Sequence, residues 1–283
     1  MIEYIKIAII ALVSGFMAPL PASASAHFSI LGSAVSLTAD AGKLGFYYAV
    51  FSVAFSVMIF ICLRKIYIKS IKLLFAPKNS NEPNLRVYKT VAKNVIITLL
   101  PMIVLFIPVG EGALLIDYFD KFLTGNSLYL TGIACIVNAL VLVIARWYAK
   151  QENKKLKRVC STGNAARMSI YQLVSFLVPG FSHVSSGSAN MLMSDVHPKF
   201  IMREVYLYLA PSIFVVNVAK IIRYLINDTI VDVVSVVIGT VIYAAMSFVV
   251  IKLVAKFNTK SVLSFFSVYS ALLGIGAIVF ALI

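Results

Sequence analysis

The chain has 283 residues, of which 61% are hydrophobic and only 13% are charged. A soluble domain usually contains about 25% charged residues, so this chain has too little polar surface to cover itself in water, and its solvent must be lipid. The net charge of +14 does not point to nucleic acid, because the basic residues fall in blocks between apolar runs, as membrane topology requires.

The first apolar stretch, residues 5–37, does not fit a simple membrane span. Gly15, Pro19 and Pro21 interrupt it, and a run of small residues that ends at His27 follows. Non-helical backbone at membrane depth is tolerated only where it is buried in protein or lines a cavity. We therefore expect two half-helices around a polar loop, which together form a re-entrant hairpin.

A cleaved signal peptide is the competing interpretation of this stretch. Lys6, the apolar run and the small residues 22–26 resemble a signal with an A-x-A cleavage site. Gly15, Pro19 and Pro21 break the apolar run, however, and a second stretch later in the chain repeats the same design. Both observations favour the hairpin, and N-terminal sequencing of the mature protein distinguishes the two interpretations.

Six other stretches are long and apolar enough, or nearly so, to cross a bilayer core, which takes about 20 helical residues. They are residues 44–63, 95–109, 128–148, 205–222, 230–254 and 262–283. The second is short and contains Pro101 and Pro108, so we expect it to be kinked or tilted. Between the third and fourth, residues 168–193 form the second hairpin candidate, interrupted by Pro179 and Gly180. The sequence predicts an all-α integral membrane protein with six transmembrane helices and two re-entrant helical hairpins.

The basic residues give these elements an orientation. If the segment after residue 63 is cytoplasmic, 20 of the 25 basic residues lie inside, and the exceptions are Lys6, Lys43, Lys121, Lys220 and Arg223. The positive-inside rule then places both termini outside. The two hairpins enter from opposite faces, and three spans follow each one. Residues 1–150 and 160–283 are thus expected to be inverted halves of a single membrane domain, 1–283, as in many transporters.

Both hairpins carry recognisable motifs. The first reads SGFMAPLPASASAH over residues 14–27, and the second reads PGFSHVSSGS over residues 179–188. They resemble the motifs E-G-x-T-E-F-L-P-[IV]-S-S-[ST]-G-H and P-G-x-S-R-S-G of the undecaprenyl-pyrophosphate phosphatases, also called the bacitracin-resistance family. The resemblance covers the whole chain, including the inverted halves, and Glu204 resembles the family's Ser-Glu-Phe segment.

The resemblance implies a phosphatase that removes one phosphate from undecaprenyl pyrophosphate at the outer face of the bacterial inner membrane. It also implies acidic residues, a divalent cation and an arginine that grips the pyrophosphate. Here the two motif glutamates fall on Ser14 and Ala18, and the motif arginine falls on His183. Serine and alanine cannot hold a divalent cation as carboxylates do, so we predict no metal ligands, which weighs against hydrolysis by the family mechanism.

The remaining polar groups of the two motifs are the candidate site. The candidate catalytic residues are His27 and Ser23, and the candidate substrate-binding residues are Ser25, Ser182, His183, Ser185 and Ser186. Hydroxyl groups and the backbone N–H groups at helix starts can cradle a phosphate without a carboxylate. Plainer roles compete: His27 could bond a loop carbonyl, His183 could fill the space of the missing arginine, and serines pack helices closely.

Three functions stay open on this sequence. The first is a phosphatase acting on a polyprenyl (pyro)phosphate lipid. The second is a non-hydrolytic transporter, or flippase, of polyprenyl phosphate or another amphipathic anion, which the missing acid pair favours. The third is a silent partner of an envelope complex. A homodimer also stays open, because nothing in the sequence fixes the oligomeric state.

Overall fold

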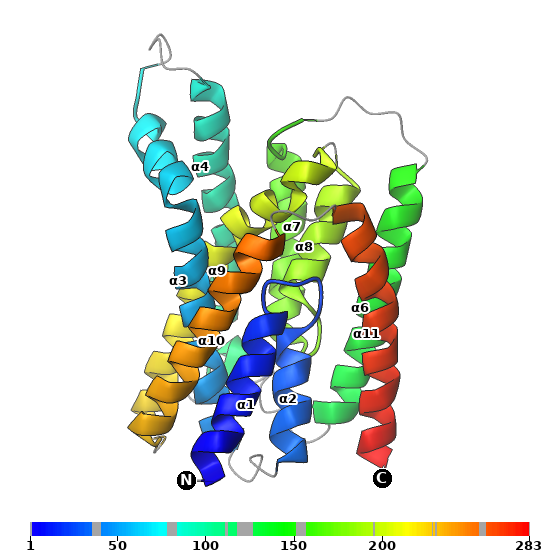
Figure 1. Ribbon diagram of the computed structural model, residues 1–283. Coiled ribbons are helices and arrows are strands. Elements are labelled where there is room, and N and C mark those ends of the chain that lie inside the picture. Colours follow the sequence, from blue (N-terminus) through cyan, green and yellow to red (C-terminus); the bar gives the residue numbers. More distant parts are fainter. Residues whose placement is uncertain are drawn as a thin grey trace.

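The computed structural model describes residues 2–35, 41–77, 84–110, 113–117, 127–150, 157–194, 196–227, 229, 231–254 and 259–282. Over these residues the regular structure is helical, and pairing of the β type is limited to two isolated bridges. The helices are α1 (Ile2–Met17), α2 (Ala24–Ala34), α3 (Ala41–Leu74), α4 (Leu85–Leu99), η1 (Leu100–Phe106), α6 (Ser127–Lys150), α7 (Thr162–Leu177), α8 (His183–Leu192), η2 (Pro198–Phe200), α9 (Ile201–Ile226), α10 (Val233–Val254) and α11 (Thr259–Leu282) (Figure 1).

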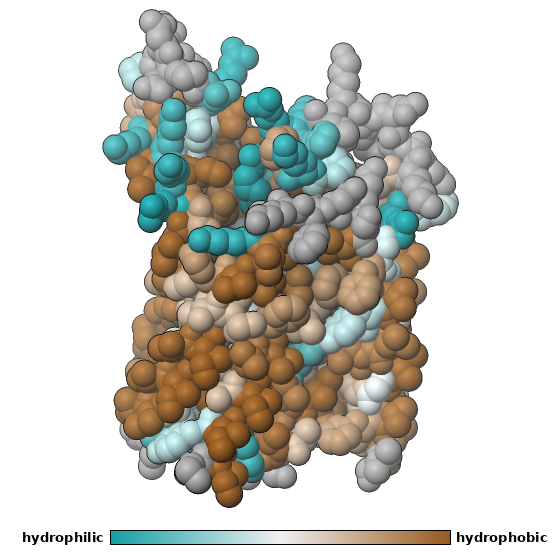
Figure 2. Space-filling view, in the orientation of Figure 1, coloured by the Kyte–Doolittle hydropathy of each residue, from teal (hydrophilic) through white to brown (hydrophobic). Residues whose placement is uncertain are grey.

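Six of these helical segments are long and apolar enough to cross a membrane. They are Gly42–Leu74, Leu85–Phe106, Leu128–Ala149, Pro198–Ile226, Val233–Val254 and Val262–Leu282. The prediction of an all-α multi-pass membrane protein with six spans is confirmed. Figure 2 shows apolar side chains over most of the body, with hydrophilic side chains gathered at its upper end.

The second span differs most from its predicted range of 95–109. It begins at Leu85, because helix α4 extends back through the basic segment that contains Arg86, Lys89 and Lys93. At Leu100 the α-helix passes into the 3-10 helix η1, with Pro101 in its first turn. Proline has no backbone N–H to continue the α-helical hydrogen bonding, so this change of helix type is the form that the expected irregularity takes.

Two helical hairpins enter the body from opposite ends. Helix α1 packs against α2, and α7 packs against α8. In Figure 1 the α1–α2 hairpin rises from the end that carries both termini, the α7–α8 hairpin descends from the other end, and their turns meet in the middle. This geometry fits the expected re-entrant arrangement.

The two ends of the molecule differ in charge. The end away from the termini, called the basic end below, is where α3 and α6 finish and where α4, α7 and α9 begin (Figure 1). Its basic residues with described side chains are Arg64, Lys65, Lys69, Lys72, Arg86, Lys89, Lys93, Arg146, Lys157, Arg158, Arg167, Lys199, Arg203 and Lys252. The opposite end, called the terminal end, carries Lys6, Lys43, Lys220 and Arg223, while Lys121 lies outside the described residues.

Helices from residues 1–150 pack against helices from residues 160–283. Helix α1 packs on α10, α3 packs on α9 and α10, α4 packs on α7 and α9, and α6 packs on α11. A core of large buried side chains joins α1, α3 and α10, where Phe51 and Tyr243 lie with ring centroids 5.2 Å apart beside Ile7. This interlocked frame holds the two hairpin turns in place.

Candidate functional site

The turns of the two hairpins are built alike. The second helix of each hairpin begins after a serine N-cap, Ser23 before α2 and Ser182 before α8. The Ser23 hydroxyl accepts a hydrogen bond from the Ala26 backbone N–H at 3.1 Å, and the Ser182 hydroxyl accepts one from the Ser185 N–H at 3.2 Å. These bonds satisfy backbone groups that a helix start would otherwise leave without a partner.

The turns also bond to each other. The Gly180 N–H donates to the Ser25 hydroxyl at 3.1 Å, and the Ser182 hydroxyl donates to the Ala22 carbonyl at 2.6 Å. Gly180 has a φ of +88°, and a Cβ there would lie 2.7 Å from the Thr131 carbonyl oxygen of α6. Only glycine takes this backbone conformation at low cost in so narrow a space. The hairpin tips are thus fixed against each other and against α6.

A cavity of about 280 Å³ lies beside the joined tips, with lining residues from α2, α3, α7, α8, α9 and α10 and from the two hairpin turns. Four of the seven predicted site residues line it: Ser23, Ser25, Ser182 and His183. Aromatic side chains, among them Phe28, Phe55 and Phe176, supply an apolar wall. The cavity therefore offers both polar and apolar surface to one ligand.

Charge in the cavity has one sign. Among the described lining residues, Lys220 is the basic one and none is a carboxylate. His183 also lines the space, with its ring 4.4 Å from that of Phe176 between centroids, and its Nδ1 has no hydrogen-bond partner among the described atoms. This combination suits an anion better than a cation.

A catalytic role for His27 requires its side chain to reach the cavity, but His27 is not among the lining residues. Its Nδ1 lies 2.7 Å from the Ser23 carbonyl oxygen, and its Nε2 lies 2.6 Å from the Tyr269 hydroxyl of α11. A carbonyl only accepts, so Nδ1 donates, and Nε2 of the neutral ring accepts from Tyr269. His27 therefore ties the first hairpin to α11.

Ser185 and Ser186 lie in the first turn of α8 and are also not among the cavity-lining residues. The Ser186 hydroxyl donates to the His183 carbonyl at 3.1 Å. The Ser185 hydroxyl is buried and has no partner among the described atoms. The structure brings Ser23, Ser25, Ser182 and His183 together around one cavity. His27, Ser185 and Ser186 are not part of its lining.

The positions of the motif glutamates do not fit a divalent cation. Ala18 lines the cavity, while Ser14 is fully buried in α1 and its hydroxyl has no described partner. The oxygen donors that line the cavity are hydroxyl, amide and carbonyl groups, and the described residues contain no cluster of three His, Cys, Asp or Glu side chains. Divalent cations of the Mg²⁺ and Ca²⁺ type bind carboxylates preferentially, so this lining is a poor metal site.

The sequence reasoning missed several lining residues, of which Asn217, Lys220 and Tyr224 on α9 matter most. Asn217 and Lys220 were polar positions in or beside a predicted span, which is a signal for function at membrane depth. In the topology prediction Lys220 is only one of the basic residues on the outer side of the membrane. Its place in the cavity depends on how α9 is rotated, which packing decides.

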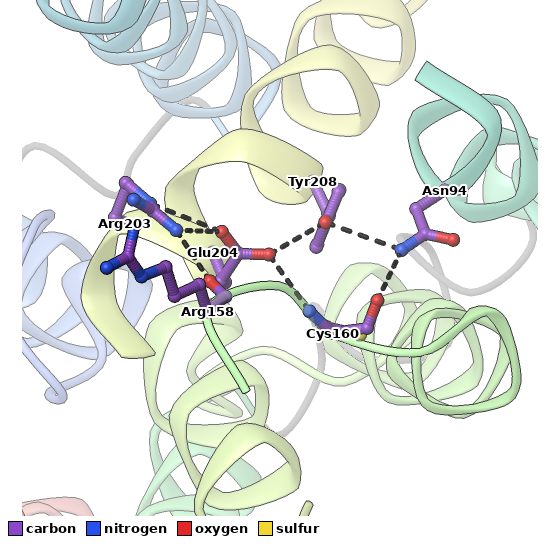
Figure 3. Close-up of polar contacts among 6 residues, drawn as sticks. All are labelled: Asn94, Arg158, Cys160, Arg203, Glu204 and Tyr208. Atoms are coloured by element: carbon purple, nitrogen blue, oxygen red, sulfur yellow. Dashed lines mark hydrogen bonds and ion pairs between the residues drawn. The ribbon is translucent and has the colours of Figure 1, made fainter. Parts of the chain in front are cut away.

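Glu204, the acid noted in the motif comparison, lies in a second polar cluster at the basic end (Figure 3). It is fully buried, one of its oxygens accepts from the Arg203 guanidinium at 2.9 Å, and the other accepts from the Tyr208 hydroxyl at 2.8 Å and from the Cys160 N–H at 3.2 Å. The Cys160 carbonyl in turn accepts from Asn94 of α4 at 2.9 Å. This acid joins α9, α4 and the segment before α7, and it does not line the cavity.

Comparisons with known proteins agree with this architecture. The chain is 26% identical to the undecaprenyl-diphosphatase 1 of Pseudoalteromonas translucida (strain TAC 125) over 282 residues, which cover 98% of each protein. The profile of the family described as bacitracin resistance protein BacA matches residues 7–276. That match takes in the turns of both hairpins, the first five spans and most of the sixth, and the chain therefore belongs to the bacitracin resistance protein BacA family.

Proposed function

We propose that this protein acts on a polyprenyl (pyro)phosphate carrier lipid, such as undecaprenyl pyrophosphate, whose phosphate end enters the central cavity. Family membership and the whole-length match to an undecaprenyl-diphosphatase support a phosphatase-type function. The observation that carries the proposal is the cavity, where both hairpin tips, aromatic rings and one ammonium group line a single space. An amphipathic anion needs both kinds of surface, one for its head and one for its chain.

The orientation of the protein follows from the same proposal. Basic residues gather at the end where α4, α7 and α9 begin, which the positive-inside rule assigns to the cytoplasm. Both termini and Lys220 then lie toward the outer face of the bacterial inner membrane. A lipid pyrophosphate released on that face would reach the cavity from the terminal end.

Hydrolysis in this cavity would use groups other than carboxylates. His183 lines the cavity and its Nδ1, which is buried here, has no described partner, so we infer that its ring takes a proton from an attacking water when the ligand is bound. Lys220 and the hydroxyls of Ser25 and Ser182 line the same space and are placed to stabilise charge on the phosphoryl oxygens. We expect phosphate release that is slow and that added Mg²⁺ or Ca²⁺ does not accelerate.

The test is phosphate release from undecaprenyl pyrophosphate by the purified protein in detergent, with and without Mg²⁺ or Ca²⁺. His183→Ala is expected to lose the release, and His27→Ala measures whether the imidazole outside the cavity takes part. Strong stimulation by a divalent cation would contradict the metal-independent chemistry. Release that never exceeds that of buffer without protein would exclude the phosphatase.

Transport of the same lipid is the second candidate, and the inverted packing supports it. In the two inverted halves, α1 corresponds to α7, α3 to α9 and α4 to α10. The contact between α1 and α10 then corresponds to the contact between α7 and α4, and the contact between α3 and α10 corresponds to that between α9 and α4. All four contacts are present. Inverted halves around a central site are a common design for alternating access. Leaflet exchange of a labelled polyprenyl phosphate in proteoliposomes tests this candidate, and exchange no faster than in protein-free liposomes would exclude it.

A further inference from the structure

One face of α9 runs along the cavity. Ile213, Asn217, Lys220 and Tyr224 are spaced by four, three and four residues, so they lie on the same side of the helix, and all four line the cavity. The face changes from apolar Ile213 to polar Asn217 and Lys220 toward the terminal end. A ligand that enters from that end meets the polar part of α9 first.

Helix α2 contributes a second polar face to the same cavity. Ser25, Ser29 and Ser33 follow one another at intervals of four residues, and all three line the space. This row runs from the joined hairpin tips toward the terminal end, where α2 finishes (Figure 1). A route with hydroxyl groups on α2 and with Asn217 and Lys220 on α9 thus leads from that end to the tips.

The charge on this route comes from Lys220. Among the described lining residues it is the one with a full positive charge, and it is half-buried, so its attraction for an anion is less screened than at an open surface. The second hairpin, where the family motif has an arginine, has His183 as its one basic side chain among the described residues that line the same space. We propose that Lys220 is the phosphate-holding residue of this protein, a role that has passed from the second hairpin to α9.

The surroundings of Lys220 fit a held ligand head. Tyr224 follows one turn later on the same face, and it packs over Gly45 of α3 so closely that a methyl group at Gly45 would overlap its hydroxyl. Asn217 precedes Lys220 by one turn, and its amide nitrogen donates to the Ile213 carbonyl at 2.8 Å, which fixes the side chain. The ligand class is an organic or inorganic phosphate or pyrophosphate, and the proposal rests on the lipid-phosphate function proposed above.

Equilibrium binding tests the proposal, by calorimetry on the full chain in detergent. The probes are farnesyl pyrophosphate, which has a lipid chain, and inorganic pyrophosphate, which has none. The variants are Lys220→Met, Lys220→Arg and the control Lys252→Met. Lys252 is on α10 outside the cavity lining, with its ammonium 4.1 Å from the centre of the Phe248 ring. Thermal unfolding verifies that each variant folds.

We expect Lys220→Met to weaken farnesyl pyrophosphate binding at least tenfold, Lys220→Arg to stay within threefold of the parent, and Lys252→Met to change nothing. Equal binding by the parent and a folded Lys220→Met variant would overturn the role of Lys220 while leaving the proposed function intact. If the parent binds only inorganic pyrophosphate, and does so through Lys220, the residue role stands and the lipid function fails. If the parent binds neither probe, both are overturned.

Discussion

Glu204 and His183 are polar side chains in the interior of the same protein, but their surroundings differ. Both carboxylate oxygens of Glu204 accept hydrogen bonds, from Arg203, Tyr208 and Cys160 (Figure 3). His183 instead lines a cavity, and its buried Nδ1 has no hydrogen-bond partner among the described atoms. A buried charge with satisfied oxygens stabilises or specifies packing, whereas polar groups around a void are available to a ligand. The two regions should therefore respond to mutation in opposite ways.

Removing the Glu204 carboxylate should have the largest effect on stability. Glu204→Ala leaves the Cys160 N–H and the Tyr208 hydroxyl without an acceptor, and buried donors in that state cost about 1–3 kcal/mol each. We expect the free energy of unfolding to fall by roughly 2–6 kcal/mol by that estimate, measured by denaturant titration in detergent. Affinity for farnesyl pyrophosphate in the folded fraction should not change.

Arg203→Met is the matched control for that variant. The Arg203 side chain is 32% exposed, so water can reach part of its ion pair with the buried Glu204, and we expect Arg203→Met to cost less stability than Glu204→Ala. Loss of pyrophosphate binding without loss of stability in Glu204→Ala would contradict the structural role and assign Glu204 to the ligand region.

Gly180 lies in the turn that holds the second hairpin against the first and against α6. Its substitution should therefore affect both the stability of the fold and ligand binding in the cavity. Gly180→Ala forces an L-residue to a φ of +88° and brings its Cβ to 2.7 Å from the Thr131 carbonyl oxygen. Strain of this kind costs about 1–3 kcal/mol. The same shift would move Ser182 and His183, so we expect weaker ligand binding together with a lower unfolding temperature.

Gly163→Ala is the control for Gly180→Ala. Nothing lies within 4 Å of a Cβ built at Gly163, which is in the first turn of α7. Alanine is the better helix former by about 1 kcal/mol, so this variant should be as stable as the parent or more so. If both glycine variants behave alike, the tip at Gly180 is not a fixed point of the site.

The contrast between the two regions also shows how much the sequence reveals. The number of spans and the two hairpins follow from the lengths of apolar runs and from the prolines and glycines that interrupt them, which are local properties. The meeting of the hairpin tips follows from counting charges on either side of the spans. Packing between helices, in contrast, decides which face of each helix points to the cavity, and no local pattern specifies that.

His27 and Lys220 illustrate this limit. The interval of four between Ser23 and His27 indicates a shared face, yet Ser23 is the cap residue and lines the cavity while His27 turns to Tyr269 of α11. Lys220 is an outer charge by topology, but the rotation of α9 places it in the lining. The start of α4 at Leu85 was missed because basic residues shorten the apolar run without ending the helix.

Ser182 should have a smaller effect than Gly180. Its hydroxyl donates to the Ala22 carbonyl of the other hairpin and accepts from the Ser185 N–H, so Ser182→Ala removes a cap and a link between the tips. Loss of a serine N-cap costs about 1 kcal/mol, and the unmade bond to Ala22 adds a similar amount. Ser186→Ala removes a bond to a carbonyl three residues back and a long one, at 3.4 Å, to the Ser175 hydroxyl of α7, and it should change stability by less than half as much.

The smallest expected effect distinguishes the two histidines. His27→Phe removes the bonds to the Ser23 carbonyl and the Tyr269 hydroxyl but preserves the near-parallel ring pair, whose planes differ by 3°. We expect a loss of about 1 kcal/mol in unfolding free energy, as for other hydrogen bonds, with farnesyl pyrophosphate affinity within threefold of the parent. His183→Phe should do the reverse, with stability preserved and binding weakened. If His27→Phe instead abolishes phosphate release while binding persists, His27 is catalytic and the contact between α2 and α11 must open during the reaction.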